Sequence, residues 1–140
     1  MQEYRHNAIS PYHISCGGVV FSQSGDRTDV LLLARYQDDK ATTYHLPKGT
    51  LHHDETLEDC ARREIREESG YAGAIVGYIG AFTYSFDKND LEVDKTVHYF
   101  AVQSQKKVGT HDAEHDEVYW KEIATARRLL EKQNHTKKNT

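Results

Sequence analysis

Several residue types that mark common protein classes are scarce in this 140-residue sequence. The two cysteines, Cys16 and Cys60, are too few for a disulfide framework and form no CxxC metal motif. We expect both to be buried free thiols, which suits a reducing compartment. No apolar run approaches the length of a membrane-spanning helix, and the N-terminal stretch MQEYRHNAIS lacks the apolar centre of a signal peptide. We therefore expect a soluble, cytoplasmic protein with no membrane partner.

An excess of positive charge is also missing. The net charge is −4, whereas a general nucleic-acid binder is normally basic, so we expect no stable nucleic-acid partner. Hydrophobic residues make up 37% and charged residues 29% of the chain, which indicates a globular rather than a disordered protein. The chain has no internal repeat and no linker between domains. We expect an N-terminal arm over residues 1–12, a single domain over 13–133 and a flexible tail over 134–140.

Hydrophobic patterning predicts a chain that mixes strands with two helices. The predicted strands cover residues 13–21, 29–36, 74–86 and 95–103, with a short strand at the end of 111–120. Residues 74–86 form either one long strand or a bent pair of strands. The predicted helices cover residues 56–69 and 121–132. Polar, glycine and proline residues predict irregular structure in segments 37–43, 44–55 and 87–94. Strands on both sides of a central helix indicate an α/β fold with a mixed sheet.

Three glutamates crowd one face of the central predicted helix, in the stretch REIREESG (63–70). Glu64, Glu67 and Glu68 stand in i, i+3 and i, i+4 relation, so their Cβ atoms are about 5–6 Å apart. Each like-charge pair costs about 0.2–0.5 kcal/mol when nothing compensates it. Either the glutamates form a solvated charged face, or a cation lies among them. Magnesium commonly takes one or two carboxylates together with substrate phosphates.

The wider segment, GTLHHDETLEDCARREIREESGY (49–71), resembles the Nudix box. That motif reads Gly, five residues, Glu, seven residues, Arg-Glu, an apolar residue, any residue, Glu-Glu, any residue, Gly and an apolar residue. The matching positions are Gly49, Glu55, Arg63, Glu64, Ile65, Glu67, Glu68 and Gly70, and only Tyr71 departs from the usual aliphatic residue. The resemblance implies an α/β/α sandwich around a mixed β-sheet. It also implies a hydrolase that cleaves nucleoside diphosphates linked to another moiety.

The resemblance assigns roles to the box residues. The implied metal ligands are the Gly49 carbonyl, Glu64, Glu67 and Glu68, and the implied cofactor is Mg²⁺, for which Mn²⁺ can substitute. The implied catalytic residues are Glu64, Glu67 and Arg63. One glutamate, or a carboxylate outside the box, deprotonates the attacking water, while Arg63 orients the glutamates and Glu55 holds Arg63 or the helix start. Phosphoryl transfer needs charge neutralisation and in-line positioning, which metal ions and such carboxylates supply.

Three flanking segments resemble the diadenosine tetraphosphate hydrolase branch of this family: LPKG (46–49), KTVHYF (95–100) and AEHDEVYW (113–120). By this resemblance Lys95 binds phosphate and Tyr99 contacts a base. Glu114 is a further metal ligand or the general base, with Glu117 as the alternative. No proline follows the box, and this argues against ADP-ribose-type substrates, whose enzymes carry one about fifteen residues further on.

The basic residues near the box have a functional and a plain interpretation. Lys48 and Lys95 are interpreted as phosphate contacts, because a polyphosphate needs positive charge beyond the metal ions. Arg35 either reaches the phosphates or lies on the surface. His111 and His115 have the i, i+4 spacing of zinc ligands on a helix, but no further zinc motif accompanies them, so we interpret them as solvated loop histidines.

The aromatic residues are divided in the same way. Tyr99 either stacks on a base or belongs to the core. Phe82, Tyr84 and Phe86 alternate on one face of a predicted strand. Most of these are expected in the core, with Tyr84 the best exposed candidate for base stacking.

Three hypotheses about function follow. The first is hydrolysis of diadenosine tetraphosphate to ATP and AMP. The second is another Nudix reaction, nucleoside triphosphate or RNA pyrophosphohydrolysis. The third is a non-catalytic nucleotide-binding module, which the complete set of box glutamates disfavours. The expected partner is a small-molecule nucleotide, and the expected assembly is a monomer or a homodimer.

Overall fold

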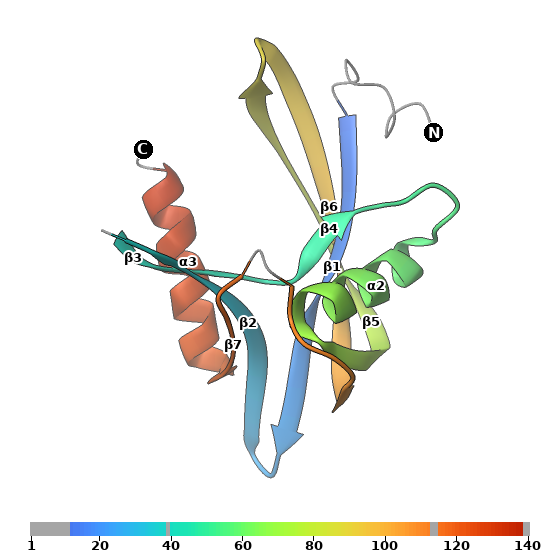
Figure 1. The fold of residues 1–140 in the computed structure, drawn as a ribbon, viewed down its shortest axis with the longest axis vertical. Helices are drawn as coiled ribbons and strands as arrows, with labels where there is room; N and C mark the ends of the chain where they lie inside the picture. Colours follow the sequence, from blue (N-terminus) through green and yellow to red (C-terminus); the bar gives the residue numbers. More distant parts are fainter. Residues whose placement is uncertain (1–11, 39, 113–114, 139–140) are drawn as a thin grey trace.

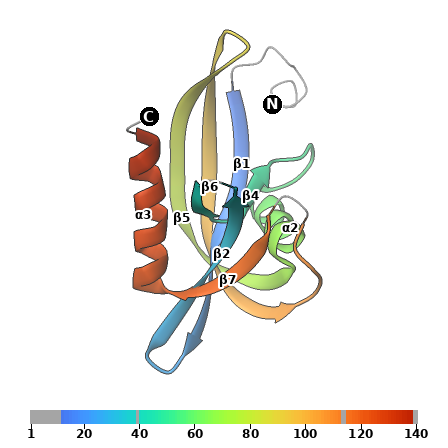
Figure 2. The same cartoon turned by 60° about the vertical axis from the view of Figure 1, so that its left-hand side comes forward.

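β-branched and aliphatic residues build a sheet that two helices cover, as seen in a computed structural model that describes residues 12–38, 40–112 and 115–138 (Figures 1 and 2). The strands are β1 (Tyr12–Ser24), β2 (Arg27–Gln37), β3 (Lys40–His45), β4 (Lys48–Thr50), β5 (Tyr71–Lys88), β6 (Leu91–Lys107) and β7 (Glu117–Glu122). The described helices are α2 (Leu57–Ser69) and α3 (Ile123–Lys138).

The described strands form one mixed sheet in the order β3-β2-β1-β6-β5, to which β4 is added beside β1 and β7 beside β2. β1 and β6 run parallel, from Tyr12 opposite Asp94 to Phe21 opposite Gln103. The other pairings are antiparallel. Along one edge, β1 pairs first with β4 and then with β2. This change of partner places β4, which leads into α2, beside the middle of the sheet.

The alternation of side chains along β2 supplies both faces of the sheet with core residues. Leu31 and Leu33 are fully buried and pack in the core that lines α2. Val30 and Leu32 point to the other face and pack with Ala126 of α3. α2 and α3 therefore lie on opposite faces (Figure 2), and the predicted α/β/α sandwich with a mixed sheet is confirmed.

Helix α2 begins and ends at the residues that the sequence indicates. The Thr56 side chain accepts a hydrogen bond from the Asp59 amide at 3.0 Å, which caps the N-terminus. Gly70 ends the helix in the left-handed region, with φ of 81°. Its carbonyl accepts hydrogen bonds from Val108 and Gly109, so the helix end is tied to the chain that follows β6.

The structure differs from the sequence-based expectations in three segments. Residues expected to be irregular form β3 and β4, which pair with β2 and β1. The segment expected as the loop 87–94 is a continuation of β5 and β6 around a tight turn, in which Asn89 and Asp90 have positive φ angles of 53° and 65°. Helix α3 continues to Lys138, past the predicted end and into the segment expected to be a flexible tail.

Cys16 and Cys60 are buried and free, as expected. Neither of the two helices that the structure describes has the length and apolar character needed to cross a bilayer. Of the N-terminal arm expected over residues 1–12, residues 1–11 lie outside the described residues and Tyr12 begins β1. The cytoplasmic location stays a prediction.

We expect Gly70→Ala to lower the free energy of unfolding by about 1–3 kcal/mol, measured by urea denaturation, because a side chain disfavours the left-handed region. A Cβ atom at Gly70 would also lie 2.4 Å from the Gly109 carbonyl oxygen. Gly77→Ala is the matched control, since no atom lies within 4 Å of its added Cβ. Equal stability of the two variants would contradict the assigned role of Gly70.

Candidate active site

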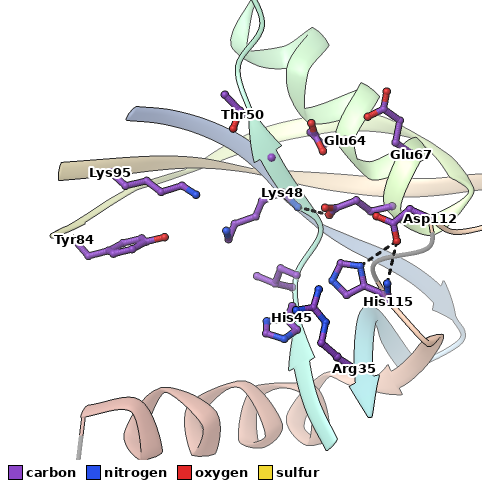
Figure 3. Close-up of a pocket in the computed structure, with 13 residues that line it drawn as sticks. Arg35, His45, Lys48, Thr50, Glu64, Glu67, Tyr84, Lys95, Asp112 and His115 are labelled. Carbon is purple, nitrogen blue, oxygen red and sulfur yellow. Dashed lines mark hydrogen bonds and ion pairs between the residues drawn. The ribbon is translucent and has the colours of Figure 1, made fainter. Parts of the chain in front are cut away.

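A polar cavity of about 700 Å³ opens between β4, α2 and the outer parts of β5 and β6 (Figure 3). Its lining brings together seven of the predicted site residues: Lys48, Gly49, Glu64, Glu67, Glu68, Tyr84 and Lys95. Arg35, His45, Asp112 and His115 also line it. The cavity therefore has an acidic wall on α2 and a basic wall on the strands.

Arg63 holds the carboxylates of the acidic wall in place through hydrogen bonds. Its guanidinium donates to both oxygens of Glu55, at 2.5 and 3.0 Å. One nitrogen, Nη1, also donates to Glu64 at 2.7 Å and to Glu67 at 3.0 Å. The other terminal nitrogen donates to the Thr50 carbonyl at 2.9 Å. These bonds offset the repulsion between the glutamates and raise the pKa of Arg63, while the hydrogen bond from Arg63 lowers the pKa of Glu55.

Glu64 lies against the backbone of Gly49. A Cβ atom at Gly49 would meet the Glu64 carboxylate at 2.1–2.4 Å, so only glycine allows this approach. Burial raises the pKa of Glu64, and Arg63 partly opposes that shift. A desolvated carboxylate is stabilised in its charged form by a nearby cation. The carboxylate and carbonyl oxygens present here are the ligand type that Mg²⁺ prefers, so the predicted donor set fits the ion.

The other two glutamates of the box differ in exposure. Glu67 is 56% exposed at its side chain and reaches into the cavity. Glu68 is buried, and its Oε1 accepts a hydrogen bond from the Lys48 amide at 2.9 Å. This bond fixes the backbone of β4 to α2, so the Gly49 carbonyl keeps its position relative to the glutamates.

The basic wall consists of two lysines with their amino groups close together. Lys48 and Lys95 point into the same space as the Tyr84 hydroxyl (Figure 3). Burial, together with the charge of Lys48, lowers the pKa of Lys95 to about 8. Two neighbouring ammonium groups repel each other, and a bound polyanion would relieve that repulsion.

A second cavity of about 550 Å³ adjoins the first, and both are lined by His45, Leu46, Lys48 and Tyr84. Its lining is mainly apolar and includes Phe82 and Tyr99, whose rings meet edge to face with centroids 5.8 Å apart. Burial raises the pKa of Tyr99 to about 12, so the phenol stays neutral. Tyr99 is thus half-buried and also borders this cavity.

The expectation that most of the β5 aromatics lie in the core is wrong. Phe82 is 58%, Tyr84 45% and Phe86 38% exposed. The outer half of the β5–β6 hairpin extends beyond both helices (Figures 1 and 2).

The candidate ligand Glu114 lies outside the described residues. Glu117, its alternative, is exposed at the start of β7 and accepts a hydrogen bond from the Val118 amide rather than lining the cavity. His115 is buried, with 8% exposure, so its interpretation as a solvated histidine is wrong. The sequence analysis missed Asp112. Its i, i+3 spacing from His115 is visible in the sequence, but this spacing does not indicate that the two residues lie close to Glu68 of α2.

On this α/β/α sandwich, an acidic helix and a pair of lysines line one cavity, an arrangement that can hold a metal ion together with phosphate groups. The profile of the NUDIX domain matches residues 11–140, and the chain therefore belongs to the Nudix hydrolase family.

Two curated relatives agree with this family. The Mycobacterium tuberculosis protein MutT4 (strain CDC 1551 / Oshkosh) is 30% identical over 113 residues, which are 78% of this chain and 46% of the relative. A nudix hydrolase 1 of Caenorhabditis elegans is 31% identical over 58 residues, which are 41% of this chain and 16% of the relative. The chain thus spans less than half the length of either relative.

Solved structures share the fold at low sequence identity. A NUDIX hydrolase from Nitrosomonas europaea has a TM-score of 0.66 at 18% identity and covers 84% of this chain and 76% of its own. A C. elegans Ap4A hydrolase scores 0.62 at 18% identity, covering 85% and 86%. The NUDIX domain of Shewanella oneidensis NrtR, complexed with ADP ribose, scores 0.66 at 17% identity, covering 91% and 86%. Identities this low show the fold alone.

We expect Arg63→Lys to weaken Mn²⁺ binding about 10–100-fold in a calorimetric titration, because lysine cannot hold the glutamates and the Thr50 carbonyl at once. Arg62→Lys is the matched control, since the neighbouring arginine is 48% exposed and pairs with Asp59 at 3.5 Å. Unchanged affinity in both variants would refute the organising role of Arg63.

Proposed function

We propose that this domain is a metal-dependent pyrophosphohydrolase that cleaves diadenosine tetraphosphate to ATP and AMP. The observation that carries this proposal is the continuity of two cavities. The polar cavity suits a metal-bound polyphosphate, and the apolar cavity suits a base, and Lys48 and Tyr84 line both. The proposed partner is therefore a small-molecule nucleotide.

The residues of the acidic wall prepare the attack by water. Magnesium held by Glu64, Glu67, Glu68 and the Gly49 carbonyl would neutralise phosphate charge and lower the pKa of a bound water. Glu67, the most accessible of these carboxylates, accepts the proton as the water oxygen forms a bond to phosphorus. The bond from phosphorus to the bridging oxygen breaks, and the departing nucleotide carries the negative charge away. Arg63 holds the carboxylates in place throughout.

The basic wall binds the part of the polyphosphate that the metal leaves uncompensated. Lys48 of β4 and Lys95 of β6 reach into the same cavity, so both can contact the phosphate chain. Arg35 lines the same cavity and can extend this contact. A longer polyphosphate gains more from these residues than a short one, which favours a tetraphosphate over a diphosphate.

The apolar cavity supplies recognition of a base. Tyr84, Phe82 and Tyr99 present aromatic surfaces that can stack on adenine. Stacking of this kind tolerates different bases. It therefore contributes to the affinity for the nucleotide more than to selectivity among bases. The exposure of Phe82 and Tyr84 agrees with a surface that a ligand covers.

We expect the domain with Mg²⁺ to convert diadenosine tetraphosphate to ATP and AMP, resolved by anion-exchange chromatography. Glu67→Gln should fold normally, because the side chain is 56% exposed, and should lower kcat by at least about 100-fold. Wild-type turnover of Glu67→Gln at saturating Mg²⁺ would refute the site. Faster cleavage of a nucleoside triphosphate to monophosphate and pyrophosphate, or of a 5′-triphosphate RNA, would replace the proposed substrate by that alternative.

We expect kcat/KM for diadenosine tetraphosphate to fall above about pH 8, because Lys95 loses its proton there and no longer attracts phosphate. Lys95→Ala should lose this step and should raise KM more for the tetraphosphate than for a diphosphate substrate. Lys88→Ala, at the exposed tip of the same hairpin, is the control and should retain the wild-type profile. A step of equal size in Lys95→Ala would show that another group titrates.

A further inference from the structure

A second group of metal-binding side chains lies on the wall of the cavity that faces β7. One ligand atom each from Glu68, Asp112 and His115 lies within 4.8 Å of the other two. All three residues line the polar cavity (Figure 3). Glu68 and His115 are buried, with 9% and 8% exposure. None of the Nudix box positions corresponds to Asp112 or His115.

The imidazole of His115 lies directly against Asp112. Its Nδ1 is 3.2 Å from Oδ1 of Asp112, and its backbone amide donates to the same oxygen at 3.3 Å. With metal–ligand bonds of about 2.0–2.2 Å, two ligand atoms of one tetrahedral or octahedral ion lie about 3 Å apart. Nδ1 and Oδ1 are therefore spaced so that one ion can bind both in place of the hydrogen bond between them.

The chemistry of this group differs from that of the box. Mg²⁺ prefers oxygen ligands, and the box offers only oxygens. An imidazole nitrogen beside two carboxylates suits borderline ions of the first transition row.

We propose that Glu68, Asp112 and His115 form a site for a divalent first-row transition ion such as Mn²⁺, next to the oxygen-only site of the box. Glu68 belongs to both sets, because it lies on α2 beside Glu67 and also faces His115. The two sites therefore share one carboxylate, as in two-metal centres whose ions are about 3.5–4 Å apart. This proposal concerns metal selectivity and is independent of the nucleotide that is cleaved.

Pulsed electron paramagnetic resonance of Mn²⁺ tests the site directly. The protein is loaded with one equivalent of Mn²⁺ in excess Mg²⁺, without nucleotide, and the echo modulation from a directly bound ¹⁴N nucleus is recorded. We expect ¹⁴N modulation, and its replacement by the ¹⁵N pattern in protein labelled at histidine. Absence of nitrogen coupling in the wild-type protein overturns the proposal without the need for any variant.

Variants then assign the nitrogen. His115→Gln should abolish the ¹⁴N modulation and raise the Kd for Mn²⁺ about 10-fold or more, and Asp112→Asn should raise the Kd while keeping the fold. His45→Gln is the matched control, since this ring lies 5.9 Å from that of His115 but is outside the group. Modulation that survives in His115→Gln but vanishes in His45→Gln overturns the assignment.

Activity separates this inference from the proposed function. Nitrogen coupling without hydrolysis of any nucleotide would leave the metal site standing and refute the enzyme. Hydrolysis with Mg²⁺ in a protein whose bound Mn²⁺ shows no nitrogen coupling would refute the metal site alone.

Discussion

The acidic site depends on the hydrogen bonds that Arg63 donates. Three glutamates within about a turn and a half of helix repel one another, and a single guanidinium compensates this by binding two of them, Glu64 and Glu67. The same group binds Glu55 before the helix and the Thr50 carbonyl after Gly49. It therefore couples α2 to β4 as well as balancing charge. Lysine could supply the charge but not the planar set of hydrogen-bond donors that the guanidinium presents.

The cavity separates charges of opposite sign, so a protein with a net charge of −4 still presents a wall whose charge suits a polyanion. The carboxylates of α2 suit cations, and the neighbouring wall carries Lys48 and Lys95. A metal ion and a polyphosphate would each satisfy one wall and attract the other. Burial disfavours the charged form of a residue on each wall. It raises the pKa of Glu64 and lowers the pKa of Lys95.

Much of the fold could be read from local patterns. The strands at the centre of the sheet and helix α2 match their predicted segments, because apolar runs and capping residues such as Thr56 and Gly70 act locally. β3 was not predicted, because its sequence KATTYH is polar and its strand character comes from pairing with β2. The exposure of Phe82 was likewise missed, because alternation does not reveal whether a helix covers that face.

The sequence by itself determined the acidic helix, its caps and the spacing of its glutamates, because helix geometry is repetitive and follows from residue separation alone. Tertiary structure decided which distant residues meet that helix. Lys95 reaches the cavity through the parallel pairing of β1 with β6, and His115 reaches Glu68 through the segment that leads into β7. Such contacts depend on the packing of the whole sheet, so local sequence patterns do not predict them.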